Sequence, residues 1–411
     1  IEVDQQGYNI FALGPPGVGK LSLVRQFLQK RASEQPAPPD FCYVNNFEQP
    51  HKPRALELPT GRGRKLQADM ESLIDDAQAT LGSAFESDSY QNRRQQLQEQ
   101  VAEQHKSSME EIQETAKQRG LAVMQSPQGL AIAPLGEDGK PMSTEEVQEL
   151  PDDKREELQE KAEDLQRKMQ EVFQEAPRVQ RQMRQKLKEL NRDVAEKALA
   201  PLIDELKQDY QDVEKVEEYL DSVKEDMVEH ADEILKSFQA SQGQQDEEQK
   251  GPRMQVRPPL PSSVRDSPLL RRYRVNALVT RENGDGAPLV YEDHPNYPNL
   301  IGRVDHMVQM GTLVTDFNLI KPGALHRANG GYLILDAHKL LMQPPLWEAL
   351  KRALRAEEIR IESLTEAVGL MRTVSLEPEP IPLRVKVVVM GRPILYQLLR
   401  ALDEDFAELF K

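Results

Sequence analysis

The residues with the clearest chemical signature form a short glycine-rich stretch near the beginning of the sequence. Gly14-Pro-Pro-Gly-Val-Gly-Lys20 fits the pattern G-x-x-x-x-G-K, between an apolar run and a helical pattern. In a phosphate loop of this type, glycines let backbone N–H groups turn inward around phosphate oxygens, the helix start adds a positive dipole, and the lysine reaches the β and γ phosphates. The stretch therefore predicts a nucleotide site, against the simpler alternative of a glycine-rich turn.

Leu21 and Ala337 predict a difficulty with metal binding and hydrolysis, as Gly391 does below, whereas Asp336 is a candidate metal ligand. Leu21 stands where a phosphate loop carries the Ser or Thr that holds magnesium, and Ser22 points elsewhere because successive helix residues are about 100° apart. Asp336 ends an apolar run and is the predicted magnesium-binding acid, unless it is only an acid that begins a turn. Ala337 stands where such ATPases carry the Glu that polarises water, so general-base assistance worth about 10²–10⁴ in rate is missing unless another residue supplies it.

The elements that would position these residues alternate between strand and helix. Apolar runs at residues 8–13 and 41–44 flank an amphipathic helix, which is the rhythm of a βαβ unit. Runs at residues 331–336 and 385–390 are continuously apolar, as strands buried inside a parallel sheet are. A helix with one apolar face is expected over residues 345–356. The two ends of the sequence thus predict one α/β domain that a long insertion interrupts.

The insertion is rich in Gln, Glu, Lys and Arg and carries apolar residues at helical spacing. From Leu158 to Ala176 the apolar steps alternate between four and three residues, which predicts a narrow seam for a partner helix. Pro177 and Pro201 are expected to separate helices, and one helix is expected from Pro201 to Phe238. Apolar runs on either side of Ser126-Pro-Gln-Gly129 predict a small β-hairpin.

Composition excludes several classes of protein. The 411 residues carry 53 Lys and Arg against 69 Asp and Glu, a net charge of −16, and so acidic a chain is not expected to bind nucleic acid. No run approaches the length of a membrane span, so no membrane partner is expected. A single cysteine, Cys42, leaves no disulfide framework and fits a reducing, cytoplasmic location. The seven histidines show no zinc-ligand spacing.

Several longer stretches resemble one family. The stretches that begin at Asp293, Ile320, Trp347 and Ile359 are similar to the AAA+ module of Lon-like proteases, in the LonC-type branch with a helical insertion. The resemblance implies an α/β fold in which an AAA+ P-loop parallel-sheet core is interrupted by a long α-helical coiled-coil insertion with a small β-hairpin. The expected division is core at residues 1–66, insertion arm at 67–250, linker at 251–268 and core again at 269–411.

The resemblance also implies a function. In that family the module binds ATP or ADP with Mg²⁺, forms a hexameric ring, and feeds unfolded or damaged polypeptide to a C-terminal peptidase domain with a Ser–Lys dyad, so no peptidase catalytic residue is expected in this chain. Hydrolysis is expected to be weak. The alternatives are a non-hydrolysing AAA+ scaffold that gates and recognises substrates, and a DNA-remodelling AAA+ protein, for which no basic patch accompanies the motifs.

Site residues follow from the resemblance position by position. The expected nucleotide-binding residues are Gly14, Pro15, Pro16, Gly17, Val18, Gly19, Lys20, Leu21, Ser22 and Asp336, with Asp336 also the magnesium ligand. A polar sensor is expected at the end of the run at 385–390, where the sequence offers Gly391 and Arg392, so Arg392 is the sensor candidate.

Contact with polypeptide is expected from a few apolar residues. Phe317 is either a pore aromatic that grips substrate or a buried strand residue. Val123 and Met124 lie off the heptad spacing and are either uncovered groups that meet substrate or interior residues of the insertion. His326 either faces a neighbouring subunit or, more simply, is a hydrogen-bonded histidine at a helix end.

Overall fold

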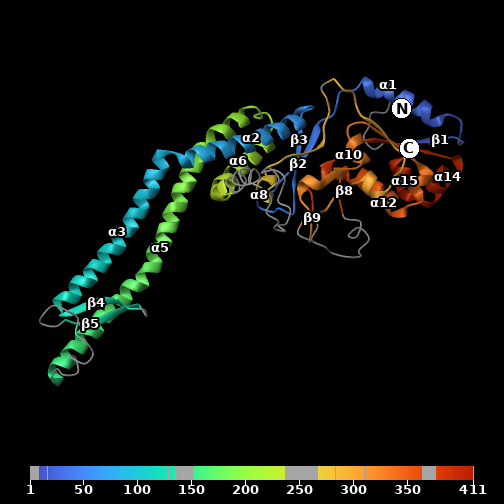
Figure 1. Cartoon of the computed structure of the whole chain (residues 1–411). Coiled ribbons are helices and arrows are strands. Elements are labelled where there is room, and N and C mark those ends of the chain that lie inside the picture. Colours follow the sequence, from blue (N-terminus) through green and yellow to red (C-terminus); the bar gives the residue numbers. More distant parts are fainter. Residues whose placement is uncertain are drawn as a thin grey trace, which may run out of the picture. The chain divides into compact units, whose positions relative to one another are not determined.

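The computed structural model describes residues 9–15, 17–126, 129–135, 142, 151–236, 267–282, 284–309, 312–362 and 376–410. The chain divides into two compact units (Figure 1). Unit 1 is drawn from residues 1–79 and 199–411, and unit 2 from residues 80–198. Within the described residues, no helix is both long enough and apolar enough to cross a membrane.

The central sheet of unit 1 has four parallel strands in the order β1-β15-β12-β7. These are β1 Ile10–Leu13, β15 Lys386–Gly391, β12 Tyr332–Asp336 and β7 Leu289–Glu292. The side chains of β12 alternate between two apolar layers, with Leu333 and Leu335 in one layer and Ile334 in the other. Both faces are therefore covered, which is why the sequence of this strand is continuously apolar. The predicted α/β class with a parallel sheet is confirmed.

Helices cover the two faces of this sheet. On one face lies α1 Lys20–Ser33, whose Leu28 and Ala32 pack against Ile334 and Val388. On the other face the helices supply most of a large apolar cluster, which includes Trp347 and Phe406. They are α9 Tyr297–Leu300, α10 Ala324–Ala328, α11 Ala337–Leu341, α12 Pro344–Ala356, α14 Pro393–Leu402 and α15 Glu404–Leu409.

The strand that follows α1 does not join the parallel sheet, so the predicted βαβ unit is wrong at this point. β2 Asp40–Val44 pairs antiparallel with β3 Arg54–Leu58 and with β6 Asn276–Val279 in a separate sheet. The chain reverses after β2 because Asn46 Oδ1 accepts the N–H groups of two residues that follow it. A short reversal of this kind produces antiparallel pairing, whereas parallel strands need a longer crossover.

Shorter elements complete unit 1. They are α8 Pro268–Arg271, β8 Gly302–Val304, β9 Met307–Gln309, β10 Thr312–Val314, the 3₁₀ turn η2 Phe317–Leu319, β11 Ile320–Pro322, β13 Glu358–Ile359 and β14 Ile381–Pro382. Three antiparallel pairs form among these strands, namely β8 with β11, β9 with β10, and β13 with β14.

The single helix predicted from Pro201 to Phe238 is wrong. The long helix α5 Asp152–Gln208 ends well before that, and α6 Glu214–Glu229 begins after a turn. Side chains from α2 Arg62–Glu86 hold the turn: Lys65 Nζ lies 2.6 Å from Asp209 Oδ2, and the Tyr210 hydroxyl donates to Asp69 Oδ2 at 2.8 Å. These contacts with α2 stabilise a chain reversal that the periodicity of the sequence does not reveal.

The expected breaks at Pro177 and Pro201 are also wrong, because α5 runs through both prolines. A proline inside a helix removes one hydrogen bond and crowds the preceding turn. Both prolines are exposed to solvent. At exposed positions water can supply partners for unpaired backbone groups, which is compatible with a helix that continues through both prolines.

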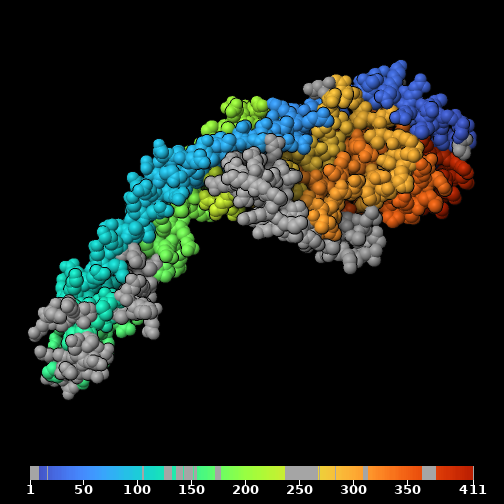
Figure 2. Space-filling model, in the orientation of Figure 1, coloured from blue at the N-terminus to red at the C-terminus, as the bar shows by residue number. Residues whose placement is uncertain are grey.

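Unit 2 is built from α3 Asp88–Gln118 and the part of α5 that runs antiparallel to it. The Tyr90 hydroxyl near the start of α3 donates to Asn191 Oδ1 on α5, whereas Ile112 near the end of α3 packs with Leu165. Both helices reach the surface on the face drawn in Figure 2. β4 Leu121–Ser126 pairs antiparallel with β5 Gly129–Pro134.

Candidate functional site

The phosphate loop joins β1 to α1, and its backbone has the conformation that the glycines were expected to allow. Gly17 and Gly19 have φ angles of 84° and 73°, which is the left-handed region that favours glycine. The helix begins directly afterwards, at Lys20. The Lys20 ammonium donates to the carbonyl oxygens of Gly14 at 2.9 Å and Gly391 at 3.1 Å. These hydrogen bonds keep the Lys20 ammonium at the loop, where phosphate oxygens can take the place of the two carbonyl oxygens as acceptors.

The other predicted loop residues take different positions. Pro15, Val18 and Ser22 are exposed, and Pro16 lies outside the described residues. Leu21 is half-buried, and its side chain packs against the apolar layer between α1 and the sheet.

Asp336 lies at the same edge of the sheet as the phosphate loop. In register, Leu13 at the end of β1 pairs with Gly391, and Asp336 pairs with Met390 one residue earlier on the same strand. Neighbouring strands are about 4.8 Å apart, so two strand spacings, about 10 Å, separate Asp336 from β1. Open α/β sheets bind ligands at this carboxyl edge. The structure thus brings the loop and the predicted acid together.

The carboxylate of Asp336 is engaged in capping a helix. Its Oδ1 accepts the backbone N–H groups of His338 at 2.9 Å and Lys339 at 3.1 Å, at the start of α11. This is the geometry of the simpler alternative, an acid that begins a turn. Arg392, the sensor candidate, is exposed and precedes α14 as its N-cap residue, and its role stays a prediction.

The fold class implies a magnesium ion at this edge of the sheet, but the side chains there do not fit one. Leu21 is packed into one apolar layer, and Ala337 is fully buried in the other. Mg²⁺ requires oxygen ligands in near-octahedral geometry, and neither residue offers an oxygen. Among the described residues, no group of three or more His, Cys, Asp or Glu side chains is arranged to hold a metal ion. The metal role predicted for Asp336 therefore lacks its partner ligand.

Phe317, a predicted substrate contact, is a core residue. It begins the 3₁₀ turn η2 rather than lying in a strand, and only 3% of its surface is exposed. Its ring packs in an apolar cluster with Tyr43 and Ile320, among others, and its carbonyl accepts a hydrogen bond from the Asn276 side chain. The assignment of Phe317 as a pore aromatic is therefore corrected: the buried alternative describes it, although the element is a turn.

An exposed apolar pair next to Phe317 was missed by the sequence reasoning. Val308 of β9 and Leu313 of β10 lie directly opposite each other in the antiparallel register, with 73% and 67% of their surfaces exposed. Neighbouring cross-strand side chains of this kind form one continuous apolar surface. The signal was present in the sequence, because apolar residues flank a glycine at Gly311 as they do in hairpins.

The two candidates on unit 2 separate in the structure. Val123 is half-buried and packs against the cluster that α3 and α5 form, which includes Leu121 and Met169. Met124 leaves 42% of its surface exposed. The interior alternative therefore describes Val123, whereas Met124 stays a candidate for substrate contact.

His326 is buried and cannot face a neighbouring subunit. It leaves 1% of its surface exposed, and its Nδ1 accepts the backbone N–H of Gly323 at 3.3 Å. Within the described structure its Nε2 has no hydrogen-bond partner. Burial, together with the positive charge of Arg327, lowers the pKa of His326 to about 3. The ring is therefore neutral at physiological pH and belongs to the core.

The stability of the protein should consequently fall as pH drops below about 6.5. The unfolded state binds a proton at His326 near that pH, whereas the folded state does not until about pH 3, so unfolding is favoured by about 1.4 kcal/mol per pH unit within this window. Denaturant unfolding at pH 7.0 and pH 5.0 should therefore give a smaller pH effect in His326→Gln than in the wild type. Equal pH effects in the two proteins would contradict this assignment.

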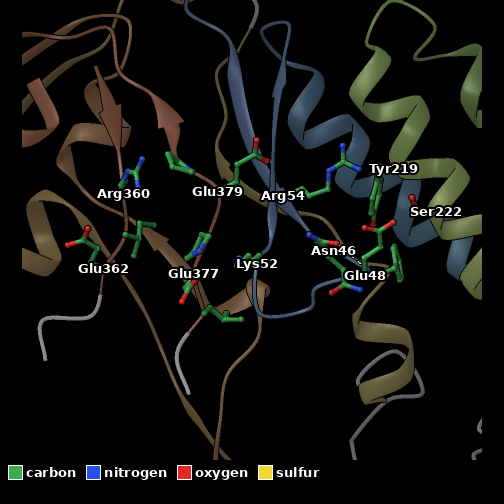
Figure 3. Close-up of a pocket in the computed structure, with 16 residues that line it drawn as sticks. Asn46, Glu48, Lys52, Arg54, Tyr219, Ser222, Arg360, Glu362, Glu377 and Glu379 are labelled. Atoms are coloured by element: carbon green, nitrogen blue, oxygen red, sulfur yellow. Dashed lines mark hydrogen bonds between the residues drawn. The ribbon is translucent and has the colours of Figure 1, made fainter. Parts of the chain in front are cut away.

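A pocket of about 870 Å³ lies in unit 1, and none of its lining residues comes from the phosphate loop. Figure 3 places Arg360 and Glu362 on one side of it and Asn46 and Tyr219 on the other. The wall carries both basic and acidic side chains, so the pocket does not present the positive surface that favours a polyphosphate. The phosphate loop therefore stays the predicted nucleotide site, and this cavity is not a second candidate for it.

Comparison with known proteins identifies two other parts of the chain, and the phosphate loop at residues 14–20 lies outside both family-model matches. A parallel sheet with a phosphate loop at its carboxyl edge is a nucleotide-binding architecture, and residues 285–411 match the family model of the LonB-like AAA domain. Residues 40–73 match that of the Lon-like LonC helical domain. A putative Lon protease homolog of Escherichia coli K12 is 35% identical over 72 residues, which is 18% of this chain and 12% of that relative. The chain therefore contains an AAA+ module of the Lon-like type, as its sequence predicted.

Proposed function

We propose that this chain is the nucleotide-binding and substrate-handling module of a Lon-like serine protease, delivering unfolded polypeptide to a C-terminal peptidase domain with a Ser–Lys dyad. The observation that carries the proposal is the phosphate loop and Asp336 at one edge of a sheet whose strands β7, β12 and β15 lie within the LonB-like match. The similarity to a putative Lon protease homolog supports the link to proteolysis. A homo-oligomeric, hexameric ring in the cytoplasm is part of the proposal.

In this proposal the loop amides and Lys20 bind the phosphate groups of ATP or ADP. The left-handed glycines orient the amides, and the α1 dipole adds to the attraction. Hydrolysis is slow, because Leu21 supplies no hydroxyl and Ala337 no carboxylate to activate water.

Polypeptide is handled elsewhere on the chain. The exposed pair Val308 and Leu313 supports a role for the β9–β10 hairpin in gripping extended chains, because two uncovered apolar side chains share one face. In unit 2, the packing of α3 against α5 supports a coiled-coil insertion, and the β4–β5 pair supports a small hairpin that presents Met124. Flexible methionine side chains suit a surface that meets many sequences.

A non-hydrolysing AAA+ scaffold that gates and recognises substrates is the second candidate. The apolar packing of Leu21 and the complete burial of Ala337 favour it, because both positions contribute to the core instead of to chemistry. The two candidates share nucleotide binding and differ in turnover.

Calorimetry with ADP tests the nucleotide site. Lys20→Ala should weaken ADP binding by about tenfold or more, since a tenfold loss corresponds to only 1.4 kcal/mol and a charge-assisted hydrogen bond to phosphate contributes at least that much. Lys30→Ala removes an equal charge from an exposed position on the same helix and should leave binding unchanged. If Lys20→Ala left the Kd for ADP unchanged, the phosphate loop would not be the nucleotide site.

Steady-state ATP turnover separates the two candidates. Turnover far below the 1–100 s⁻¹ typical of phosphoryl-transfer enzymes is expected for a slow ATPase, and none at all for the scaffold. A rate inside that range would mean that another residue replaces the missing base, and it would overturn the expectation of slow hydrolysis.

A further inference from the structure

Leu21, the residue after Lys20, packs against the core instead of facing the phosphate site. Leu21 packs against the layer that contains Leu28, Ile334 and Val388, between α1 and the central sheet. A threonine at this position would place a hydroxyl beside the phosphates, where a metal ion could use it. The apolar side chain instead contributes to the attachment of α1 to the sheet.

At the ends of β12 and β15, close packing around Ala337 and Gly391 likewise leaves no space for a polar side chain. Ala337 is fully buried, and a Cβ atom added at Gly391 would lie 2.9 Å from the Ala337 Cβ and 2.5 Å from the Phe11 ring. Cβ atoms in proteins essentially never lie within 3.0 Å of a non-bonded heavy atom. The end of β15 therefore has no room for a larger side chain, and no polar group from these positions can reach a metal ion or its water shell.

The acidic side chains at this edge already have a cation near them. Lys339 Nζ donates to the carbonyl oxygen of Asp293 at 2.6 Å and to its carboxylate at 2.8 Å, at the end of β7. The hydrogen bond to Asp293 raises the pKa of Lys339, and the charge of Asp336 adds to this effect. A divalent cation that approached Asp336 would meet this ammonium group.

From these observations we propose that the phosphate loop binds the phosphate groups of a nucleotide as a metal-free anion. The inference rests on the nucleotide binding proposed above and concerns the form of the ligand. Lys20 and the loop amides attract negative charge, and Mg²⁺ bound to the phosphates neutralises part of that charge. Of the predicted ligands only Asp336 remains, with its Oδ1 engaged in capping α11 and the Lys339 ammonium nearby. The protein therefore compensates poorly for this loss, and Mg²⁺ competes with the loop for the phosphates.

Calorimetric titration of the 411-residue chain with ADP and, separately, with inorganic pyrophosphate tests the inference. Each titration is run in excess Mg²⁺ and again in EDTA. The expected result is a Kd in EDTA equal to or smaller than the Kd in Mg²⁺ for both probes. Binding that Mg²⁺ tightens by more than about threefold, which is about 0.7 kcal/mol, would overturn the inference and leave the proposed nucleotide site intact. No binding in either buffer would overturn both.

A substitution that restores the missing oxygen provides a second measurement. Leu21→Thr should make ADP binding tighter in Mg²⁺ than in EDTA, and Leu23→Thr, at a position with 71% of its surface exposed on the same helix, should not. Loss of packing at Leu21 lowers stability, so circular dichroism confirms that the variant is folded at the temperature of titration. If Leu21→Thr fails to fold, the wild-type comparison between the two buffers decides the question alone.

Discussion

Replacing Gly391 with Asn is expected to destabilise the protein instead of creating a nucleotide sensor. A Cβ atom at this position would lie 2.5 Å from Phe11 Cζ. The Phe11 ring cannot move away, because it packs against the rings of Tyr396 and Phe406 at centroid distances of 5.5 and 5.7 Å. Overpacking of a core costs about 1–3 kcal/mol and sometimes more, and we expect the upper end here because backbone and ring are both fixed. Thermal unfolding followed by circular dichroism measures the effect.

The neighbouring residue provides a matched control for this prediction. Arg392→Asn places the same side chain one residue later, at the exposed N-cap of α14, where Asn is a favourable residue, and should not lower the melting temperature. If Gly391→Asn melted at the wild-type temperature and raised ATP turnover, the edge of the sheet would have room for a sensor. The conclusion that close packing around Gly391 leaves no space for a larger side chain would then be wrong.

The central sheet and the phosphate loop could be predicted from local sequence because each is determined by a strong local requirement. Strand β12 is apolar at consecutive positions over a short length, which is typical of a strand covered on both faces. The loop needs positive φ angles at fixed positions, and Gly17 and Gly19 supply them. Asp336 followed from its place at the end of a buried strand.

Features that depend on distant contacts could not be predicted. Pro201 is compatible with a continuous helix because it faces solvent, and its exposure is decided by packing that periodicity does not report. The turn after Gln208 exists because Lys65 and Asp69, far away in sequence, bind Asp209 and Tyr210. The separate antiparallel sheet around β2 likewise depends on β6, which the insertion separates from it in the sequence.

Phe317 shows the same limitation at a candidate functional residue, and its substitution should have the largest effect on stability of those considered. An aromatic residue after an apolar, glycine-containing stretch suits a pore loop and a core turn equally well, so local sequence leaves the choice open. In the structure its ring is 3% exposed, and its cluster includes Phe41 and Ile381 from two different sheets. Truncation would leave a cavity where these sheets meet.

Phe317→Ala is therefore expected to lower the free energy of unfolding by about 3–5 kcal/mol, the range for truncating a buried phenylalanine to alanine in a core. Leu313→Ala, on the exposed pair with Val308, should change it by less than about 0.5 kcal/mol. Capture of a chemically unfolded protein, measured at a temperature where both variants are folded, should show the reverse order, with the loss in Leu313→Ala. If Phe317→Ala kept full stability and lost capture, its ring would contact substrate, and the hairpin pair would not be the gripping surface. Phe317 and Leu313 are a suitable pair for this comparison because they lie close in sequence, whereas one is buried and the other exposed.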